Sequence, residues 1–200
     1  MPIIAVAACA VLSYLLGSIP FTYLAGRLVR GIDLSRLGSG NLGGANAVRV
    51  LGPVPGLLAG LADVGKAALA VVLARLLAGG TTAPALAATA AALGHSYSLY
   101  LGFAKGGKAI SPLLGSFAVL APLPTLASLA LGLALVGLTR FVSLGALAFA
   151  AFLPVLLLVL GGPVPFILAA AAMACLAFWR HRGNIGRLLA GTERRLGERA

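Results

Sequence analysis

Long apolar runs alternate with short polar segments along most of the chain. The apolar runs cover residues 3–25, 51–78, 82–103, 110–139, 141–160 and 163–179. A helix needs roughly 17 to 25 mostly apolar residues to cross the hydrocarbon core of a bilayer. Each run is long enough for a crossing, so the pattern predicts an all-α protein that crosses a membrane several times.

One of these runs is too long for a single crossing. Residues 110–139 form an apolar run that Pro122 and Pro124 interrupt. A proline inside a helix removes a hydrogen bond and kinks or ends the helix. We therefore expect two shorter helices hinged at the prolines. This gives about seven transmembrane helices in one membrane domain, residues 1–200, whose last part, residues 180–200, is a polar tail.

Lys and Arg are distributed unevenly. If there are seven spans, every Lys and Arg except Lys66 and Arg75 falls on one side of the membrane. Loops rich in Lys and Arg stay on the cytoplasmic side. We therefore expect a multi-pass protein of the bacterial cytoplasmic membrane, with the N-terminus outside and the C-terminus in the cytoplasm. The polar chemistry would then face the cytoplasm.

The composition excludes an ordinary soluble fold. Hydrophobic residues make up 60% of the chain and charged residues 10%, with a mean hydropathy of +1.07, whereas a soluble domain carries about 25% charged residues. A net charge of +11 suggests nucleic acid in a soluble protein, but here the basic residues lie between apolar runs. We therefore expect anionic substrates and membrane lipid as partners, and no nucleic acid. Cys9 and Cys175 show no metal-binding spacing, so no metal site is expected.

Residues 33–49 form the first of three polar segments. The candidate residues there are Gly38, Ser39, Gly40, Asn41, Asn46 and Arg49. Glycine-rich loops at the start of a helix offer open backbone N–H groups to an anion, and a guanidinium can bind a phosphate through two parallel hydrogen bonds. The segment therefore predicts phosphate binding. The alternative is a connecting loop in which Ser39 or Asn41 caps a helix.

The second polar segment follows the third apolar run. Its sequence Lys105-Gly106-Gly107-Lys108 places two ammonium groups around two glycines, which suits a phosphate. The alternative is an ordinary turn flanked by lysines of the cytoplasmic side. His95 precedes this loop within an apolar run, where a polar side chain is costly and therefore suggests a function. A packed, purely structural histidine is the alternative.

The third polar segment contains His181 and Asn184. They are three positions apart and can share a helix face at the membrane surface. Most arginines of this segment are expected to anchor the tail. Asp63 and Lys66 have the same spacing within the second apolar run, where an ion pair would lower the cost of insertion, so we expect them to be structural.

The three segments, in this order, resemble the bacterial acyl-phosphate glycerol-3-phosphate acyltransferases, the PlsY family. The resemblance covers essentially the whole chain. The matching motifs are Gly17-Ser18-Ile19-Pro20-Phe21, Gly38-Ser39-Gly40-Asn41 with Asn46 and Arg49, Asp63 with Lys66, Gly94-His95, Gly106-Gly107-Lys108, Asn184-Ile185-x-Arg187-Leu188 and Gly191-Thr192-Glu193.

The resemblance implies an acyltransferase. Such an enzyme moves a fatty acyl group from acyl phosphate to the 1-hydroxyl of glycerol 3-phosphate. The products are 1-acyl-glycerol 3-phosphate (lysophosphatidic acid) and phosphate, and the reaction belongs to phospholipid biosynthesis. The resemblance also implies seven spans, no metal or organic cofactor, and a soluble partner enzyme that forms the acyl phosphate.

The resemblance and the residue patterns together suggest roles for individual residues. Catalytic roles fall on Ser39, Arg49, His181 and Asn184. Binding of the substrates and their phosphates falls on Gly38, Gly40, Asn41, Asn46, His95, Lys105, Gly106, Gly107 and Lys108. Structural roles fall on Asp63, Lys66 and Glu193. The working hypothesis for this family is that the phosphate of glycerol 3-phosphate acts as the base for its own hydroxyl, while Ser39 hydrogen-bonds the substrate.

The chain departs from the family pattern mainly in the second segment. The family usually reads Phe-Lys-Gly-Gly-Lys-Gly, whereas this chain inserts Ala104 and has Ala109 in place of the last glycine. It also has Ala45 where the family usually has threonine. One alternative is therefore a divergent paralogue with altered or lost activity. A small membrane transporter, with Asp63 and Lys66 at membrane depth, and a non-catalytic assembly protein are the others.

Overall fold

The structure, a computed structural model, describes residues 3–198, and every regular element in that range is a helix. The elements, in chain order, are α1 (Ile3–Ser18), α2 (Phe21–Arg30), η1 (Leu34–Arg36), α3 (Gly44–Leu51), α4 (Pro53–Ala78), α5 (Thr82–Ser96), η2 (Leu99–Leu101), α6 (Ile110–Leu120), α7 (Pro122–Thr139), α8 (Val142–Val159), α9 (Val164–Arg180) and α10 (Arg182–Leu189).

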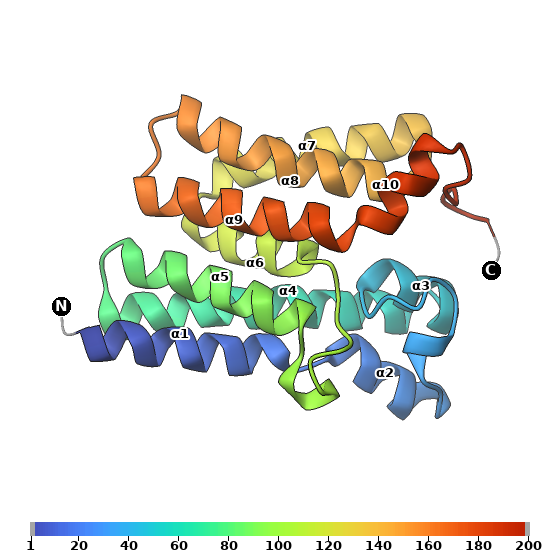
Figure 1. The fold of residues 1–200 in the computed structure, drawn as a ribbon, viewed down its shortest axis with the longest axis horizontal. Helices are drawn as coiled ribbons and strands as arrows, with labels where there is room; N and C mark the ends of the chain where they lie inside the picture. Colours follow the sequence, from blue (N-terminus) through green and yellow to red (C-terminus); the bar gives the residue numbers. More distant parts are fainter. Residues whose placement is uncertain (1–2, 199–200) are drawn as a thin grey trace.

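The long helices form two groups that α6 joins (Figure 1). Helices α1, α4 and α5 pack against one another, α8 packs against α7 and α9, and α6 contacts helices of both groups. The short helices α2, α3 and α10 gather at the end of the bundle opposite the N-terminus. The bundle therefore has one end where short helices and loops meet, and this end holds the polar segments.

Small residues let α1 and α5 approach each other closely. Gly17 of α1 lies against the backbone of Ala91, and Gly94 of α5 lies against the backbone of Tyr14, so a Cβ atom at either glycine would overlap these backbone atoms. Membrane helices commonly use small residues for such close contacts. Larger buried side chains fill the space between α6, α8 and α9, among them Phe117, Phe149, Leu153 and Met173.

The predicted break at the prolines is confirmed, since α6 ends at Leu120 and α7 begins at Pro122. The expected span over residues 3–25 lies within the candidate span Ile3–Arg30, but its helix is interrupted. Helix α1 ends at Ser18 and α2 begins at Phe21, with Pro20 between them. Pro20 has no N–H to donate and restricts the backbone of the residue before it, so the helix is interrupted here and resumes at Phe21.

Two further boundaries differ from the sequence expectations. Helix α5 ends at Ser96 and does not continue to residue 103, because the Ser98 hydroxyl donates to the Ser18 carbonyl at 2.6 Å and ties the chain to the end of α1. Residues 180–200 are not only a polar tail, because α10 occupies Arg182–Leu189. This helix brings Asn184 and Arg187 to the same carboxylate, Glu193.

The protein is an all-helical membrane bundle, as expected. Within residues 3–198, four helical segments are long and apolar enough to cross a membrane: Ile3–Arg30, Pro53–Ala78, Pro122–Thr139 and Val142–Val159. The pair Val164–Arg180 and Arg182–Leu189, bent by 61°, makes a fifth if it is counted as one span. The count of seven spans and the orientation of the termini stay predictions.

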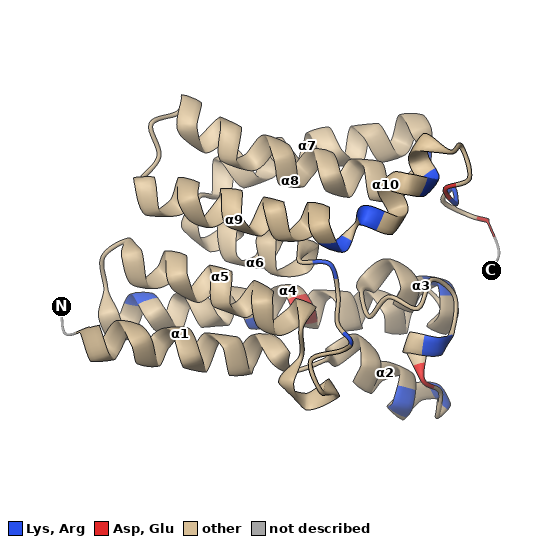
Figure 2. Cartoon of the chain, in the orientation of Figure 1, with Lys and Arg blue, Asp and Glu red and all other residues tan. Residues whose placement is uncertain are grey.

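Lys and Arg gather at the end of the bundle where α2, α3 and α10 lie (Figure 2). The opposite end carries Arg75 in the last turn of α4. This separation of charge agrees with the expectation that the three polar segments share one side of the membrane.

We expect Gly17→Ala to lower the free energy of unfolding by about 1–3 kcal/mol, the usual cost of overpacking, because the added methyl group meets backbone that cannot move aside. Gly65→Ala is the matched control, since a Cβ at Gly65 meets open space. Denaturant unfolding in detergent micelles measures both variants. Equal stability of the two would contradict the close α1–α5 contact.

Candidate active site

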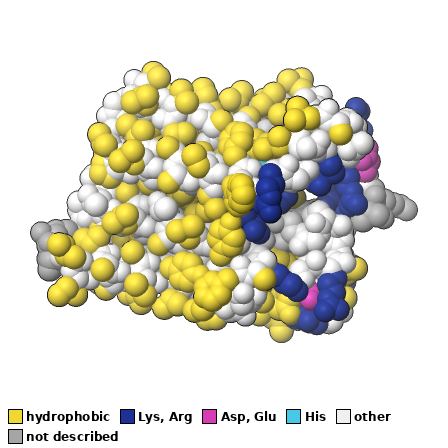
Figure 3. Space-filling model, viewed as in Figure 1, with side chains coloured by type: hydrophobic (Ala, Val, Ile, Leu, Met, Phe, Trp, Pro, Cys, Tyr) yellow, Lys and Arg dark blue, Asp and Glu magenta, His cyan; other side chains and the backbone are white. Residues whose placement is uncertain are grey.

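A pocket of about 480 Å³ opens at the cationic end of the bundle. Figure 3 shows Lys and Arg side chains around a hollow at this end. The walls come from the loop before α3, from α3 itself, from the starts of α6 and α8, from the α9–α10 junction and from the segment after α10. Sequence candidates in the lining are Gly38, Ser39, Asn41, Asn46, Arg49, His95, Lys108, His181, Asn184 and Glu193. The pocket therefore brings the three polar segments together.

Asn46 shapes the glycine loop of the first segment. Its buried side-chain oxygen accepts the Ser39 N–H at 2.9 Å, and its amide donates to the carbonyls of Leu34 at 3.3 Å and Leu37 at 3.1 Å. Gly38, with φ +61°, packs so tightly on this amide that a side chain would collide with it. The polar atoms of Asn46 are thus committed to the loop, and they hold Ser39 at the pocket.

Only some of the backbone N–H groups that were expected to bind an anion are free to do so. The N–H groups of Ser39 and Gly40 are already bonded, the second to the Leu37 carbonyl at 3.0 Å. Gly44 and Ala45 open α3 and line the pocket, and within residues 3–198 their N–H groups have no partner. An anion at this end of α3 would find two open donors and the positive end of the helix dipole.

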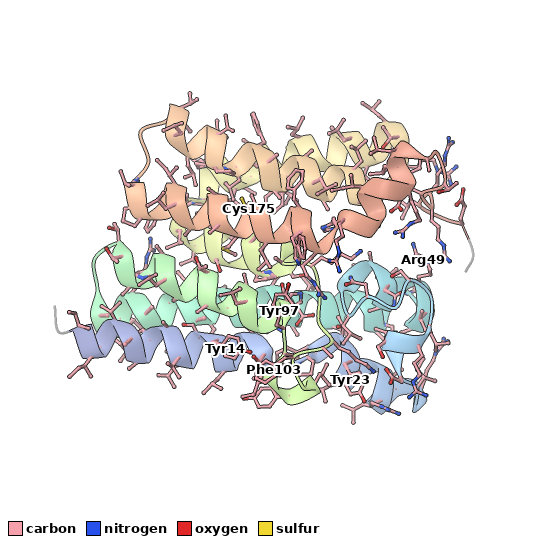
Figure 4. The ribbon with its side chains drawn as sticks, in the orientation of Figure 1. Tyr14, Tyr23, Arg49, Tyr97, Phe103 and Cys175 are labelled. Carbon is pink, nitrogen blue, oxygen red and sulfur yellow. The ribbon has the colours of Figure 1, made fainter. Side chains whose placement is uncertain are left out.

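Arg49 is half-buried in the pocket wall and makes no hydrogen bond or ion pair with the described residues. Figure 4 shows it on α3, on the side that faces α10 and the C-terminal segment. A guanidinium without a protein partner in a concave site is a ready binding group for a phosphate. The hydroxyl of Ser39 likewise has no partner within residues 3–198.

The second segment contributes Lys108. Its ammonium group donates to the side-chain oxygen of Asn184. Burial, with a smaller contribution from the nearby Arg187, lowers the pKa of Lys108 to about 8. Lys108 is therefore mostly charged at neutral pH and loses its charge in mildly alkaline solution.

Gly106 and Gly107 are fastened to the neighbouring helices. Arg180 donates to their carbonyls at 3.2 and 3.0 Å, and the Gly107 N–H donates to the carbonyl of His95 at 2.9 Å. These glycines lie behind the pocket wall, and the Gly107 N–H is not open to a ligand. Their observed contacts position Lys108.

Lys105 lies outside the pocket. Its ammonium group is 3.5 Å from the Asp33 carboxylate and donates to the Ser35 hydroxyl at 2.8 Å. Gly40 also lies outside the lining, in a turn with φ +69°. The two lysines of the second segment thus have different surroundings, which the sequence alone does not distinguish.

Asp63, Lys66 and His95 form a buried cluster between α4 and α5. The structure shows the expected ion pair, with 2.6 Å between Lys66 Nζ and an Asp63 oxygen, and the same ammonium group donates to the Ile19 carbonyl at 2.5 Å. His95 Nδ1 lies 3.6 Å from Asp63, and the other side of the ring packs on Gly107. The cluster connects the α1–α2 break to the second segment.

His181 lies at the bend between α9 and α10. Its Nδ1–H donates to the Ala177 carbonyl at 2.8 Å, because a carbonyl oxygen can only accept. Burial lowers the pKa of His181 to about 4. At neutral pH the ring is therefore uncharged, with the lone pair on Nε2.

Glu193 ties the third segment to α8. One carboxylate oxygen accepts the Ser143 hydroxyl at 2.7 Å and the Asn184 amide at 2.6 Å, and the other accepts Arg187 Nε at 2.7 Å. Burial raises the pKa of the carboxyl, but the hydrogen bonds from Asn184, Ser143 and Arg187 outweigh burial and hold the pKa below its usual value. Glu193 is therefore ionised at neutral pH.

Four basic side chains and one carboxylate line the pocket: Arg49, Lys108, Arg187 and Arg194 against Glu193. Ser143, Arg187 and Arg194 were not among the residues predicted from sequence. Arg187 belongs to one of the family motifs found in the sequence. Its position near Ser143 and Glu193 arises only when the chain folds. The excess of positive charge suits an anionic ligand, and the apolar Ile110, Val142 and Ala146 suit a ligand with a hydrocarbon part.

The fold and the site thus define an integral membrane protein with a cationic pocket that joins an apolar wall. A family model described as glycerol-3-phosphate acyltransferase matches residues 7–191. The chain is 47% identical over 188 residues to a protein of Synechococcus sp. (strain CC9902) named glycerol-3-phosphate acyltransferase, covering 94% of each chain. A protein of the same name from Parasynechococcus marenigrum (strain WH8102) is 43% identical, covering 94% of this chain and 89% of that one.

Two solved structures are also similar. Both are crystal structures of PlsY (YgiH), an integral membrane glycerol 3-phosphate acyltransferase, and both are 34% identical to this chain. The glycerol 3-phosphate form gives a TM-score of 0.91 with 96% of each chain covered; the lysophosphatidic acid form gives 0.89 with 96% and 95% covered. The chain belongs to the glycerol-3-phosphate acyltransferase (PlsY) family.

We expect sulfate to bind the pocket more weakly at pH 9 than at pH 7. Sulfate keeps its charge over this range, whereas Lys108, with a pKa of about 8, becomes mostly neutral. Loss of one charged contact of about 1.4 kcal/mol corresponds to about tenfold in affinity. Thermal stabilisation as a function of sulfate concentration measures the change.

Lys108→Arg provides the control for this pH dependence, because a guanidinium stays charged at pH 9. Its sulfate affinity should be nearly the same at both pH values. An equal loss of affinity in the native protein and in this variant would show that Lys108 is not the titrating group.

Proposed function

We propose that this chain transfers a fatty acyl group from acyl phosphate to the 1-hydroxyl of glycerol 3-phosphate, releasing lysophosphatidic acid and inorganic phosphate in phospholipid biosynthesis. Membership of the glycerol-3-phosphate acyltransferase family supports the acceptor and the reaction class. The similar PlsY structures, a glycerol 3-phosphate form and a lysophosphatidic acid form, support the same acceptor and product for this chain.

The observation that carries the proposal is that α3 lines the pocket with Arg49, which has no partner within residues 3–198, and with the open N–H groups of Gly44 and Ala45. These groups face one cationic pocket from one wall, and Lys108 faces it from another. Both substrates carry phosphate, so these groups can bind either substrate. Positioning two reactants in one site and stabilising developing charge account for large parts of the rate enhancement of many enzymes.

Acyl phosphate as donor agrees with what the pocket offers. It is a mixed anhydride, so its phosphate is already a good leaving group and the enzyme need not activate it covalently. The attacking hydroxyl oxygen forms a bond to the acyl carbon. The bond from that carbon to the phosphate oxygen breaks, and its electron pair leaves with the phosphate. Cations around the pocket would stabilise the charge that develops on this leaving group.

Ser39 is not arranged as an acylated nucleophile. An activated serine hydroxyl normally bonds to a neighbouring base, and within residues 3–198 the Ser39 hydroxyl makes no hydrogen bond to His181 or Glu193. We propose that Ser39 donates a hydrogen bond to substrate. The hydroxyl proton of glycerol 3-phosphate would pass to the phosphate of the same molecule, and neutral His181 would accept a substrate hydrogen bond through Nε2.

The changed second segment does not remove Lys108 from the pocket. Ala109 adopts the left-handed conformation, φ +64°, that glycine usually takes, and begins α6. The chain therefore keeps the turn despite the alanine, at a cost of about 1 kcal/mol. This favours an active acyltransferase over a divergent paralogue that has lost its activity.

We propose that the pocket faces the cytoplasm across a seven-span bundle. The grouping of Lys and Arg at one end supports this orientation. A soluble enzyme would supply the acyl phosphate, and the acyl chain would reach the pocket from the membrane.

The direct test is turnover of the purified protein in lipid nanodiscs with acyl phosphate and glycerol 3-phosphate. We expect equal amounts of phosphate and lysophosphatidic acid. Arg49→Ala and Lys108→Ala should each reduce kcat/KM by about 100-fold or more, because each removes charge that the leaving phosphate requires. Chromatographic homogeneity and melting temperature establish that the variants are folded.

Lys105→Ala is the matched control, since Lys105 pairs with Asp33 outside the pocket. It should keep kcat/KM within about threefold of the native value, in the range of an exposed ion pair. Absence of product from folded native protein would reject the proposed reaction. Equal losses for the two lysine variants would reject the position of the active site.

A further inference from the structure

The segment that follows α10 is fastened to the corner between α7 and α8. We call residues 191–198 the C-terminal strap. The Leu196 N–H donates to the Arg140 carbonyl at 2.6 Å, and Arg140 Nη2 donates back to the Leu196 carbonyl at 2.7 Å. Arg140 thus holds one residue of the strap through both its backbone and its side chain.

Two further contacts support the same attachment. The guanidinium of Arg195 lies over the ring of Phe141, 5.4 Å from its centroid, a cation–π distance. Glu193 accepts the hydroxyl of Ser143 on α8. The strap is therefore attached on both sides of Arg194, at Glu193 before it and at Arg195 and Leu196 after it.

Arg140 ends α7 in an unusual backbone conformation. Its φ is +63°, in the left-handed region that residues other than glycine seldom adopt. Such conformations persist where surrounding contacts fix them. Here the turn aims both the carbonyl and the side chain of Arg140 at Leu196.

Arg194 lies in the pocket wall and makes no hydrogen bond or ion pair within residues 3–198. The other basic side chains of the strap and of α10 are engaged, Arg195 over Phe141 and Arg187 on Glu193. Lys108 is bonded to Asn184. Within the described pocket, Arg49 on α3 and Arg194 on the strap are the guanidinium groups without a protein partner.

We propose that Arg194 is a phosphate-binding residue of this pocket, held in position by the attachment of the strap to Arg140. This inference rests on the proposed function, in which the pocket takes two phosphate-bearing substrates at once. Two unpaired guanidinium groups on two separate elements match two phosphates. Arg49 would bind one, and Arg194 would bind the other.

The test is steady-state kinetics of Arg194→Gln with each substrate varied in turn. We expect KM for one substrate, glycerol 3-phosphate or acyl phosphate, to rise about tenfold with kcat within threefold, because binding is lost and chemistry is not. The substrate whose KM rises is the one that Arg194 binds. Arg194→Lys should restore part of the affinity, since a charge remains.

Arg182→Gln is the matched control, because it removes a guanidinium that lies over Trp179, outside the pocket lining and apart from the contacts that attach the strap. Both KM values should stay within twofold. If both KM values of Arg194→Gln also stay within twofold, or if kcat alone falls, Arg194 does not bind a substrate phosphate and the proposal is overturned. An equal rise for the two variants would overturn it as well, since net charge alone would explain the effect.

The attachment is tested with Arg140→Gly. Glycine tolerates φ +63°, so the turn remains while the side-chain bond to Leu196 is lost. As a positioning residue, Arg140 should affect the same KM as Arg194, by about threefold to tenfold. A normal KM in Arg140→Gly would show that Arg194 does not depend on this attachment.

Equilibrium binding separates this inference from the proposed reaction. Thermal stabilisation by glycerol 3-phosphate and by sulfate requires no turnover. If the native protein makes no product, yet Arg194→Gln weakens sulfate binding about tenfold and Arg182→Gln does not, the anion site is supported while the proposed reaction is rejected. The native protein could instead be active while Arg194→Gln changes neither KM nor the affinity for glycerol 3-phosphate or sulfate. That result would reject the role of Arg194 and leave the proposed reaction intact.

Discussion

The organisation of the pocket depends on one carboxylate, Glu193, whose side chain is 7% exposed. Its two oxygens accept three hydrogen bonds, from Ser143 of α8 and from Asn184 and Arg187 of α10. Asn184 in turn accepts a bond from Lys108 of the second segment. Elements distant in the sequence thereby meet around one negative charge. Loss of the carboxylate would leave the buried Ser143 hydroxyl and the half-buried Asn184 amide without their acceptor, at about 1–3 kcal/mol each.

The same network decides which basic groups remain for a ligand. Glu193 engages Arg187, Asn184 takes one of the three N–H donors of Lys108, and Arg49 has no partner among the described residues. The start of α3 presents two open N–H groups to the same pocket. Because the pocket also has an apolar wall at the starts of α6 and α8, a phosphate and a hydrocarbon chain can be held together. A membrane-embedded acyltransferase that joins a soluble acceptor to a lipid donor requires that combination.

The sequence predicted the helical membrane bundle, the break at Pro122 and the Asp63–Lys66 pair, because apolar run length, proline chemistry and helical spacing are local properties. The residues named from the sequence, largely through the family motifs, include half of those that line the pocket. The sequence did not separate Lys108 from Lys105, or show that the Gly107 N–H is occupied. Those outcomes depend on Asp33, Asn184 and His95, partners distant in the sequence that only the fold brings close.

The central claim is that acyl transfer occurs directly between two substrates held in one cationic pocket, without an acyl-enzyme. Rapid-quench measurement with acyl phosphate alone tests this most directly, with mass spectrometry of the protein at each time point. The account predicts no burst of phosphate and no acylated Ser39 until glycerol 3-phosphate is added. A burst of one phosphate per protein molecule, with an acyl group on Ser39, would contradict it.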